Sequence, residues 1–184
     1  MHLFYISFII ITLFVNLLAG FNDRCRMDPF NKAVTVHSLK YICNNDELRN
    51  IFLNSKAGPF PPNSKFKGHI LACPSGACDL LELMIESLWS GKNVVSSGGS
   101  WPNDHGFVTN NMLGTFDMFK APFYRTIAPI DGKEAMAIDY ANDLFLFILM
   151  DYVRKVQNNL FLGIVTFRPF FKTPIMYFLL EIVD

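Results

Sequence analysis

The sequence predicts a mainly β protein with accessory helices, in which a small antiparallel barrel forms the main body. In the C-terminal half, apolar segments follow one another closely and are separated by turn residues, as in all-β domains. The segment 174–183 alternates with one fully apolar face, whereas 160–167 is apolar on both faces. Such a strand must be covered on both sides, and a small barrel with helices packed outside satisfies this requirement.

The N-terminus has the pattern of a secretory signal peptide. Residues 3–18 are apolar, the small residues Ala19 and Gly20 follow, and charged residues begin shortly after them. An uncleaved anchor is the alternative, because an apolar stretch of ~20 residues can span a bilayer. We predict a signal peptide over 1–20 and a mature protein that is secreted to the extracellular space, with no membrane association after cleavage.

Composition narrows the classes of partner. The chain has sixteen Lys and Arg against sixteen Asp and Glu, so it is formally neutral. These charges are scattered, and no basic stripe is present that would neutralise phosphates. Nucleic acid is therefore not expected as a partner. The nineteen Phe residues can instead build a large core or line an apolar cavity.

All four cysteines follow the predicted signal peptide. An even number in a secreted chain indicates disulfides, and three pairings are open from the sequence alone. We expect nearest-neighbour pairing, Cys25 with Cys43 and Cys73 with Cys78, since Pro and Gly between the last two allow a tight loop. A thiol pair for metal or redox chemistry is the alternative, but the spacing is not CxxC.

An N-terminal arm with one short helix precedes the barrel. Residues 21–41 show no clear period and are predicted as an extended lead-in. Residues 44–56 favour a helix, because Asn44 or Asn45 can cap it and acidic residues occupy its first turn. A Pro-rich stretch then ends the helix. We therefore divide the chain into a signal peptide, 1–20, an arm, 21–62, and a barrel domain, 63–184.

The barrel domain begins with mixed signals and continues with strand-like ones. A strand is predicted at 65–72, an amphipathic helix at 78–89 and extended structure at 90–97. The closely spaced apolar segments that follow are 107–119, 123–130, 134–141, 160–167 and 174–183.

Ile130–Lys133, reading IDGK, is the clearest hairpin signal. Asp-Gly supplies the positive φ of a type I′ turn, so the turn should join 123–128 to 134–140.

A filled interior and an apolar cavity for one ligand are both consistent with the strand pattern of the barrel. Alternation in the second strand of this hairpin directs three side chains to one face: Met136, Ile138 and Tyr140.

The stretch Leu144–Gly163, reading LFLFILMDYVRKVQNNLFLG, begins with an apolar run. The run is too short to span a bilayer, for which ~20 residues are needed. In a helix, Asp151 would lie one turn from Arg154, a spacing that favours ion pairing. We predict a strand or loop entering a short helix at Asp151–Val156, docked over the barrel.

Three segments together resemble a known family. They are WSGK at Trp89–Lys92, DGKEAMAIDY at Asp131–Tyr140 and, more loosely, MDYVRKVQNNLFLG at Met150–Gly163. This order is similar to that of small, uncharacterised GXWXG-type proteins with a lipocalin-like barrel. The resemblance implies a lipocalin-like fold from Phe66 to Glu181 and carries no settled activity.

Candidate ligand-binding residues fall near these segments. Trp89 is predicted to close a pocket and Lys92 to hold an anionic head group; a packing Trp with a solvated Lys is the alternative. Tyr140 either donates a hydrogen bond into a cavity or simply packs.

A second group of candidates is charged. Arg154 with Asp151 and Asp139 is predicted to form a buried polar cluster at one end of the barrel, orienting a ligand's polar tip. A structural ion pair that ties a helix to the sheet is the alternative.

The sequence thus favours a secreted protein that binds a small apolar or amphipathic ligand. A secreted protein-interaction factor with a packed barrel and no ligand is the alternative. An enzyme has little support, because only Asp139, Asp151 and His69 offer loose candidates. We assign no catalytic residue, no cofactor and no metal site, and the oligomeric state stays open.

Overall fold

The structure is a computed structural model that describes residues 24–74, 88–96, 105–170 and 172–183. The chain divides into two compact units, Met1–Cys43 and Asn44–Asp184. The second unit therefore includes residues 44–62, which belong to the predicted arm. The predicted signal peptide, 1–20, and most of the predicted helix at 78–89 lie outside the described residues.

The first unit contains a helix where an extended lead-in was predicted. Helix α2 spans Lys32–Tyr41, and Asn31 caps it by accepting a hydrogen bond from the Val34 amide. The buried side chains of this helix are mainly polar: Ser38 Oγ accepts from the Arg26 amide at 2.8 Å, and Thr35 bonds Asp28. The prediction of extended structure was wrong because this helix has almost no apolar face for a periodicity argument to find.

The first predicted disulfide is confirmed. Cys25 and Cys43 are joined, with a Cα–Cα distance of 4.6 Å. Cys73 is disulfide-bonded as well, but its predicted partner, Cys78, lies outside the described residues. Disulfides are compatible with an extracellular protein. Within the part of the chain that the structure describes, no helix combines the length and apolar character needed to cross a bilayer.

The second unit opens with the predicted short helix. Helix α3 spans Asn45–Asn54 and starts with a capping box, in which the Asn44 side chain accepts from the Glu47 amide and the Glu47 side chain accepts from the Asn44 amide. Leu48 and Phe52 form its buried face. The cap and the apolar spacing were both readable from the sequence, so this prediction is confirmed.

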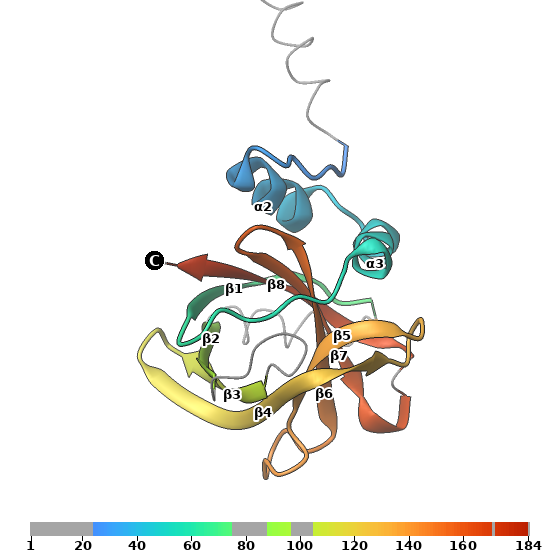
Figure 1. Ribbon diagram of the computed structural model, residues 1–184. Coiled ribbons are helices and arrows are strands. Elements are labelled where there is room, and N and C mark those ends of the chain that lie inside the picture. Colours follow the sequence, from blue (N-terminus) through green and yellow to red (C-terminus); the bar gives the residue numbers. More distant parts are fainter. Residues whose placement is uncertain (1–23, 75–87, 97–104, 171, 184) are drawn as a thin grey trace, which may run out of the picture. The chain divides into compact units, whose positions relative to one another are not determined.

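The strands of the described residues form a closed antiparallel barrel in which each strand pairs with its sequence neighbour and β1 pairs with β8 (Figure 1). This is an up-and-down barrel, the architecture of lipocalins, and the predicted fold class is confirmed. A 3-10 turn, η1 (Arg168–Phe170), precedes the last strand. The strands are β1 (Lys65–Ala72), β2 (Trp89–Ser96), β3 (His105–Met112), β4 (Phe116–Ala128), β5 (Lys133–Asp139), β6 (Leu149–Gln157), β7 (Leu160–Phe167) and β8 (Pro174–Val183).

The short helix predicted at Asp151–Val156 is also wrong. Asp151–Val156 is part of strand β6 and not a helix. β6 pairs with β5 along one edge and with β7 along the other, so the ladder satisfies its backbone groups on both sides. Asp151 and Arg154 are therefore three residues apart on a strand, where odd spacing sends their side chains to opposite faces.

The hairpin predicted at IDGK is present, although its turn type differs. Ala128 pairs with Lys133 across a four-residue loop, and the Gly132 amide donates to the Ala128 carbonyl at 2.9 Å. Gly132 has φ +70°, and Asp131 is not among the residues with positive φ. A type I′ turn needs positive φ at two positions, so this is a longer loop that ends on a left-handed glycine.

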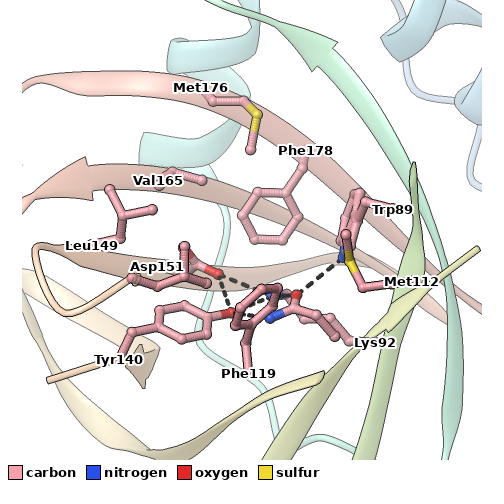
Figure 2. A pocket seen from close by; sticks show the side chains of 12 residues that line it. Trp89, Lys92, Met112, Phe119, Tyr140, Leu149, Asp151, Val165, Met176 and Phe178 are labelled. Atoms are coloured by element: carbon pink, nitrogen blue, oxygen red, sulfur yellow. Dashed lines mark hydrogen bonds and ion pairs between the residues drawn. The ribbon is translucent and has the colours of Figure 1, made fainter. Parts of the chain in front are cut away.

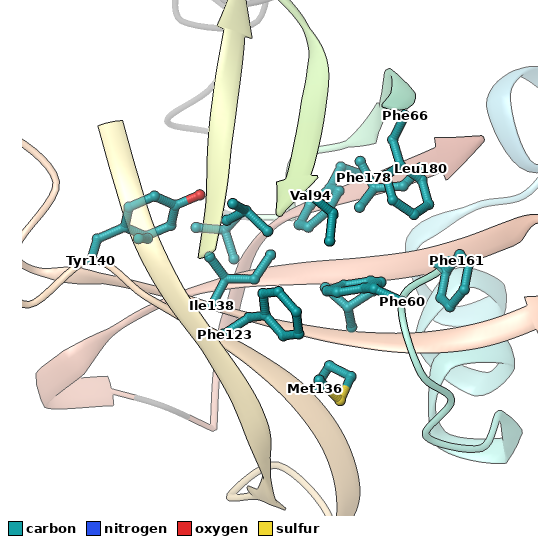
Figure 3. Packing of buried hydrophobic residues seen from close by; sticks show 14 residues of the cluster. Phe60, Phe66, Val94, Phe123, Met136, Ile138, Tyr140, Phe161, Phe178 and Leu180 are labelled. Atoms are coloured by element: carbon teal, nitrogen blue, oxygen red, sulfur yellow. The ribbon is translucent and has the colours of Figure 1, made fainter. Parts of the chain in front are cut away.

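The interior of the barrel is filled at one end by aromatic rings (Figure 3). Phe60 lies on the chain between α3 and β1 and packs edge-on against Phe66, Phe123 and Phe161, with ring centroids 5.6, 5.2 and 5.4 Å away. Met136, Ile138 and Tyr140 all belong to the same core, as their alternation predicted.

Strand β7 is buried on both of its faces, as the sequence required. Phe161 and Val165 belong to the core inside the barrel, while Leu162 and Ile164, which point the other way, are also fully buried. Helix α3 packs against the neighbouring strand β6 and so provides part of the outer cover. The predicted combination is therefore present: a helix packs outside the barrel, on the strand next to the one that is apolar on both faces.

Candidate functional site

The WSGK segment carries a β-bulge that directs two side chains inward. The pairing of β2 with β3 shifts register between Trp89 and Gly91, and Gly91 has φ +141°. Trp89 and Lys92 are three residues apart, so they would face opposite sides of a regular strand. The bulge allows both to line the same cavity. Only glycine fits at this position, because a Cβ on Gly91 would lie 1.9 Å from the Phe66 carbonyl oxygen.

A hydrogen-bonded cluster forms one wall of this cavity (Figure 2). The Lys92 ammonium donates to Asn110 Oδ1 at 2.8 Å and to the Tyr140 hydroxyl at 2.6 Å, and it lies 3.2 Å from Asp151 Oδ2. Asn110 Oδ1 also accepts from Trp89 Nε1 at 3.0 Å, and Asn110 Nδ2 donates to Tyr140 at 3.2 Å. The Tyr140 hydroxyl donates to Asp151 Oδ2 at 3.3 Å. All three ammonium protons are thereby engaged.

Burial and mutual charge set the protonation of this cluster. Burial alone lowers the pKa of Lys92, but the Tyr140 and Asp151 oxygens outweigh it and raise that pKa above 10.5. Burial, together with the Asp151 charge, raises the pKa of Tyr140 to about 12. Burial also raises the pKa of Asp151, opposed by the Lys92 ammonium. Because a lone buried ammonium costs more than a neutral ion pair, Asp151 is the ionised partner of Lys92.

The cluster faces an apolar cavity of about 170 Å³. An engineered apolar cavity of ~150 Å³ binds benzene, so this volume suits a molecule of similar size. The apolar walls come from β3, β4, the β5–β6 loop and strands β6 to β8: Met112, Phe119, Leu146, Leu149, Val165, Met176 and Phe178.

Four of the predicted ligand-binding residues meet at this cavity: Trp89, Lys92, Tyr140 and Asp151. Sequence reasoning missed Asn110, which bridges three of them. A usable signal was present, because Asn110 follows Val108 at strand spacing and therefore points into the barrel, where an apolar side chain is the rule.

Arg154 lies elsewhere, so the predicted cluster with Asp151 and Asp139 is wrong. Its guanidinium is fully buried over the Phe52 ring and bonds the Asp131 carboxylate at 2.7 and 2.8 Å. It also donates to the carbonyls of Phe52, Lys133 and Glu134. These contacts tie α3 to the β4–β5 turn, which matches the structural alternative for this residue.

Asp139 is also separate from the cavity. It accepts from the Tyr124 hydroxyl at 2.9 Å and pairs with Arg168. Ile138 and Tyr140, its neighbours in the chain, belong to the core, so alternation places Asp139 on the outer face.

No protein-family model and no curated protein matches this chain. Among solved structures, the chain is similar to a crystal structure of a protein from Thermomonospora curvata, with a TM-score of 0.57 and 15% sequence identity. The match covers 83% of this chain and 95% of that one. At this identity the similarity supports the fold alone.

Proposed function

We propose that this protein is secreted and binds one small apolar or amphipathic molecule inside its barrel. The observation that carries the proposal is the cavity of about 170 Å³ with a single buried polar wall. Ligand sites are typically apolar pockets in which a few fixed polar groups orient the ligand. The apolar N-terminus and the disulfide between Cys25 and Cys43 support export.

A pair of matched variants tests the proposal. Val165→Phe fills the cavity from β7, whereas Val95→Phe adds the same volume at an exposed site on β2. Each protein is secreted from a eukaryotic host, weighed by native mass spectrometry and then extracted under denaturing conditions. We expect a bound small molecule in the wild type and in Val95→Phe, and its loss in Val165→Phe.

The same experiment addresses a second candidate, a protein-interaction factor. The loop between β5 and β6 exposes Leu144, Phe145 and Phe147 at 82, 74 and 53%, and exposed apolar groups of this kind mark interaction surfaces. An unliganded mass for all three proteins would contradict small-molecule binding and favour this candidate.

A further inference from the structure

The charge balance of the polar wall points to the chemical class of the ligand, and this inference rests on the proposed binding function. Lys92 and Asp151 have side chains that are only 3 and 5% exposed, and they are the charged residues among those described that line the cavity. Their charges cancel. A ligand with a net charge of either sign would therefore bring an uncompensated charge into a buried site, which is strongly unfavourable.

The hydrogen-bonding capacity of the wall adds a second restriction. Lys92 has no proton left for a carboxylate, because Asn110, Tyr140 and Asp151 take all three. Among the described residues, in contrast, Asp151 Oδ1 accepts no hydrogen bond, and Asn110 Nδ2 donates only one of its two protons, to Tyr140. The amide orientation of Asn110 follows from its neighbours, since the Lys92 and Trp89 donors both require an oxygen.

We propose that the cavity selects neutral apolar molecules that carry a hydroxyl group, and rejects carboxylates and ammonium ions of the same size. A hydroxyl is both a donor and an acceptor, so it matches the Asp151 carboxylate oxygen and the spare Asn110 amide proton together. The volume of about 170 Å³ suits the buried part of a small alcohol or phenol.

Four compounds of nearly equal size test this class: benzyl alcohol, toluene, benzoate and benzylammonium. Each is titrated calorimetrically into the wild-type protein at pH 7. We expect benzyl alcohol to bind most tightly, with toluene roughly tenfold weaker because it lacks the hydrogen bond to a charged acceptor. Benzoate and benzylammonium should each bind at least roughly tenfold more weakly than the alcohol.

The failures of the two proposals are distinguishable. Binding of benzoate or benzylammonium as tight as that of the alcohol would overturn the ligand class and leave small-molecule binding intact. Toluene binding equal to that of benzyl alcohol would overturn the role of the hydroxyl. If none of the four compounds bound, the ligand class would also be overturned, while the proposed function would still be decided by the native mass measurement.

Charge variants provide an independent arm. Asp151→Asn leaves Lys92 without its counter-charge, so the ratio of benzoate to benzyl alcohol affinity should rise at least roughly tenfold. Lys92→Gln leaves the Asp151 carboxylate without its counter-charge, so the ratio of benzylammonium to benzyl alcohol affinity should rise by a similar factor. Circular dichroism establishes which variants fold. An unchanged preference in either folded variant would overturn the proposal, and the wild-type series decides it if neither folds.

Discussion

Arg154 illustrates how much one buried side chain can organise. It is fully buried, yet its guanidinium pairs with Asp131 and bonds three backbone carbonyls. A buried charge is tolerated only when it is paired and its donors are satisfied, and this network does both. The residue therefore stabilises the junction between α3 and the β4–β5 turn, and it does not line the cavity.

The effect of Asp131→Asn on stability should depend on pH, because the substitution removes the carboxylate that pairs with Arg154. The Arg154 hydrogen bond lowers the pKa of Asp131 below its ordinary 3.8. A depressed folded-state pKa means that the stabilisation is present above the unfolded pKa and is lost as pH falls through the folded value. At pH 7 we expect the variant to lose about 3 kcal/mol. In urea unfolding, its difference from wild type should shrink on acidification below pH 3.8.

The exposed Asp117→Asn is the control and should change stability by no more than about 0.5 kcal/mol at either pH. A constant difference between Asp131→Asn and wild type across this pH range would contradict the ion-pair account.

Arg154→Met should separate stability from binding. The variant removes the guanidinium that lies over the Phe52 ring and leaves Asp131 without its ion-pair partner, so we expect a lower unfolding temperature. Since Arg154 does not line the cavity, the benzyl alcohol affinity of the folded variant should equal that of wild type. A lowered benzyl alcohol affinity of this variant in calorimetry would contradict this separation and indicate that Arg154 contributes to ligand binding.

At the scale of an element, the bulge in β2 is the feature that builds the site. It interrupts the alternation of side chains between the two faces of the strand. Trp89 and Lys92 therefore face the same cavity although they are three residues apart. The neighbouring strand accommodates the Trp89 ring through Gly68, where a Cβ would lie 2.5 Å from that ring. Glycines thus make room for both the bulge and the indole.

Gly91→Ala should damage both the barrel and its site. The backbone has φ +141°, and the added methyl group would overlap the Phe66 carbonyl oxygen. We expect a loss of at least about 1–3 kcal/mol in chemical denaturation, together with weaker benzyl alcohol binding. Near-ultraviolet circular dichroism should also report a changed Trp89 environment.

Gly132→Ala is the matched control, because Gly132 also has positive φ but a Cβ there meets no atom within 4 Å. It should cost about 1–2 kcal/mol and leave binding unchanged. Equal effects of the two variants on ligand affinity would show that the bulge does not position the site.

At the scale of the molecule, the barrel interior has two parts with different roles. One part is packed with rings around Phe60, and the other contains the cavity and its polar wall. Dense packing at one end provides stability through buried apolar area. That stability offsets the cost of a buried ion pair and of unfilled volume at the other end.

Phe60→Ala should therefore be among the most destabilising single substitutions. It removes a 1% exposed ring from contact with three others, and such truncations cost about 3–5 kcal/mol. Phe170→Ala, at 68% exposure, is the control and should be nearly neutral. Urea denaturation checks both variants. A loss of unfolding free energy below about 1 kcal/mol for Phe60→Ala would contradict the central place of this ring in the core.

The local chain determined much of this structure by itself. Strand alternation gave the inward face of β5, the Asn44 cap gave α3, and a strand that is apolar on both faces indicated a covered barrel. These features depend on neighbours in the sequence, so their periodicity and chemistry are readable there. Trp89 and Lys92 were candidates from one short motif, but their odd spacing predicts opposite faces of a strand, and the bulge in β2 brings both to the cavity.

Only the tertiary structure decided which charges meet. In the sequence, Asp151 stands three residues from Arg154, but pairing with β5 and β7 makes that segment a strand and sends the two side chains to opposite faces. Asp151 then meets Lys92 from across the barrel, and Arg154 meets Asp131. Long-range pairing overrides local spacing, because register and barrel closure, and not distance along the chain, determine which side chains share a buried site.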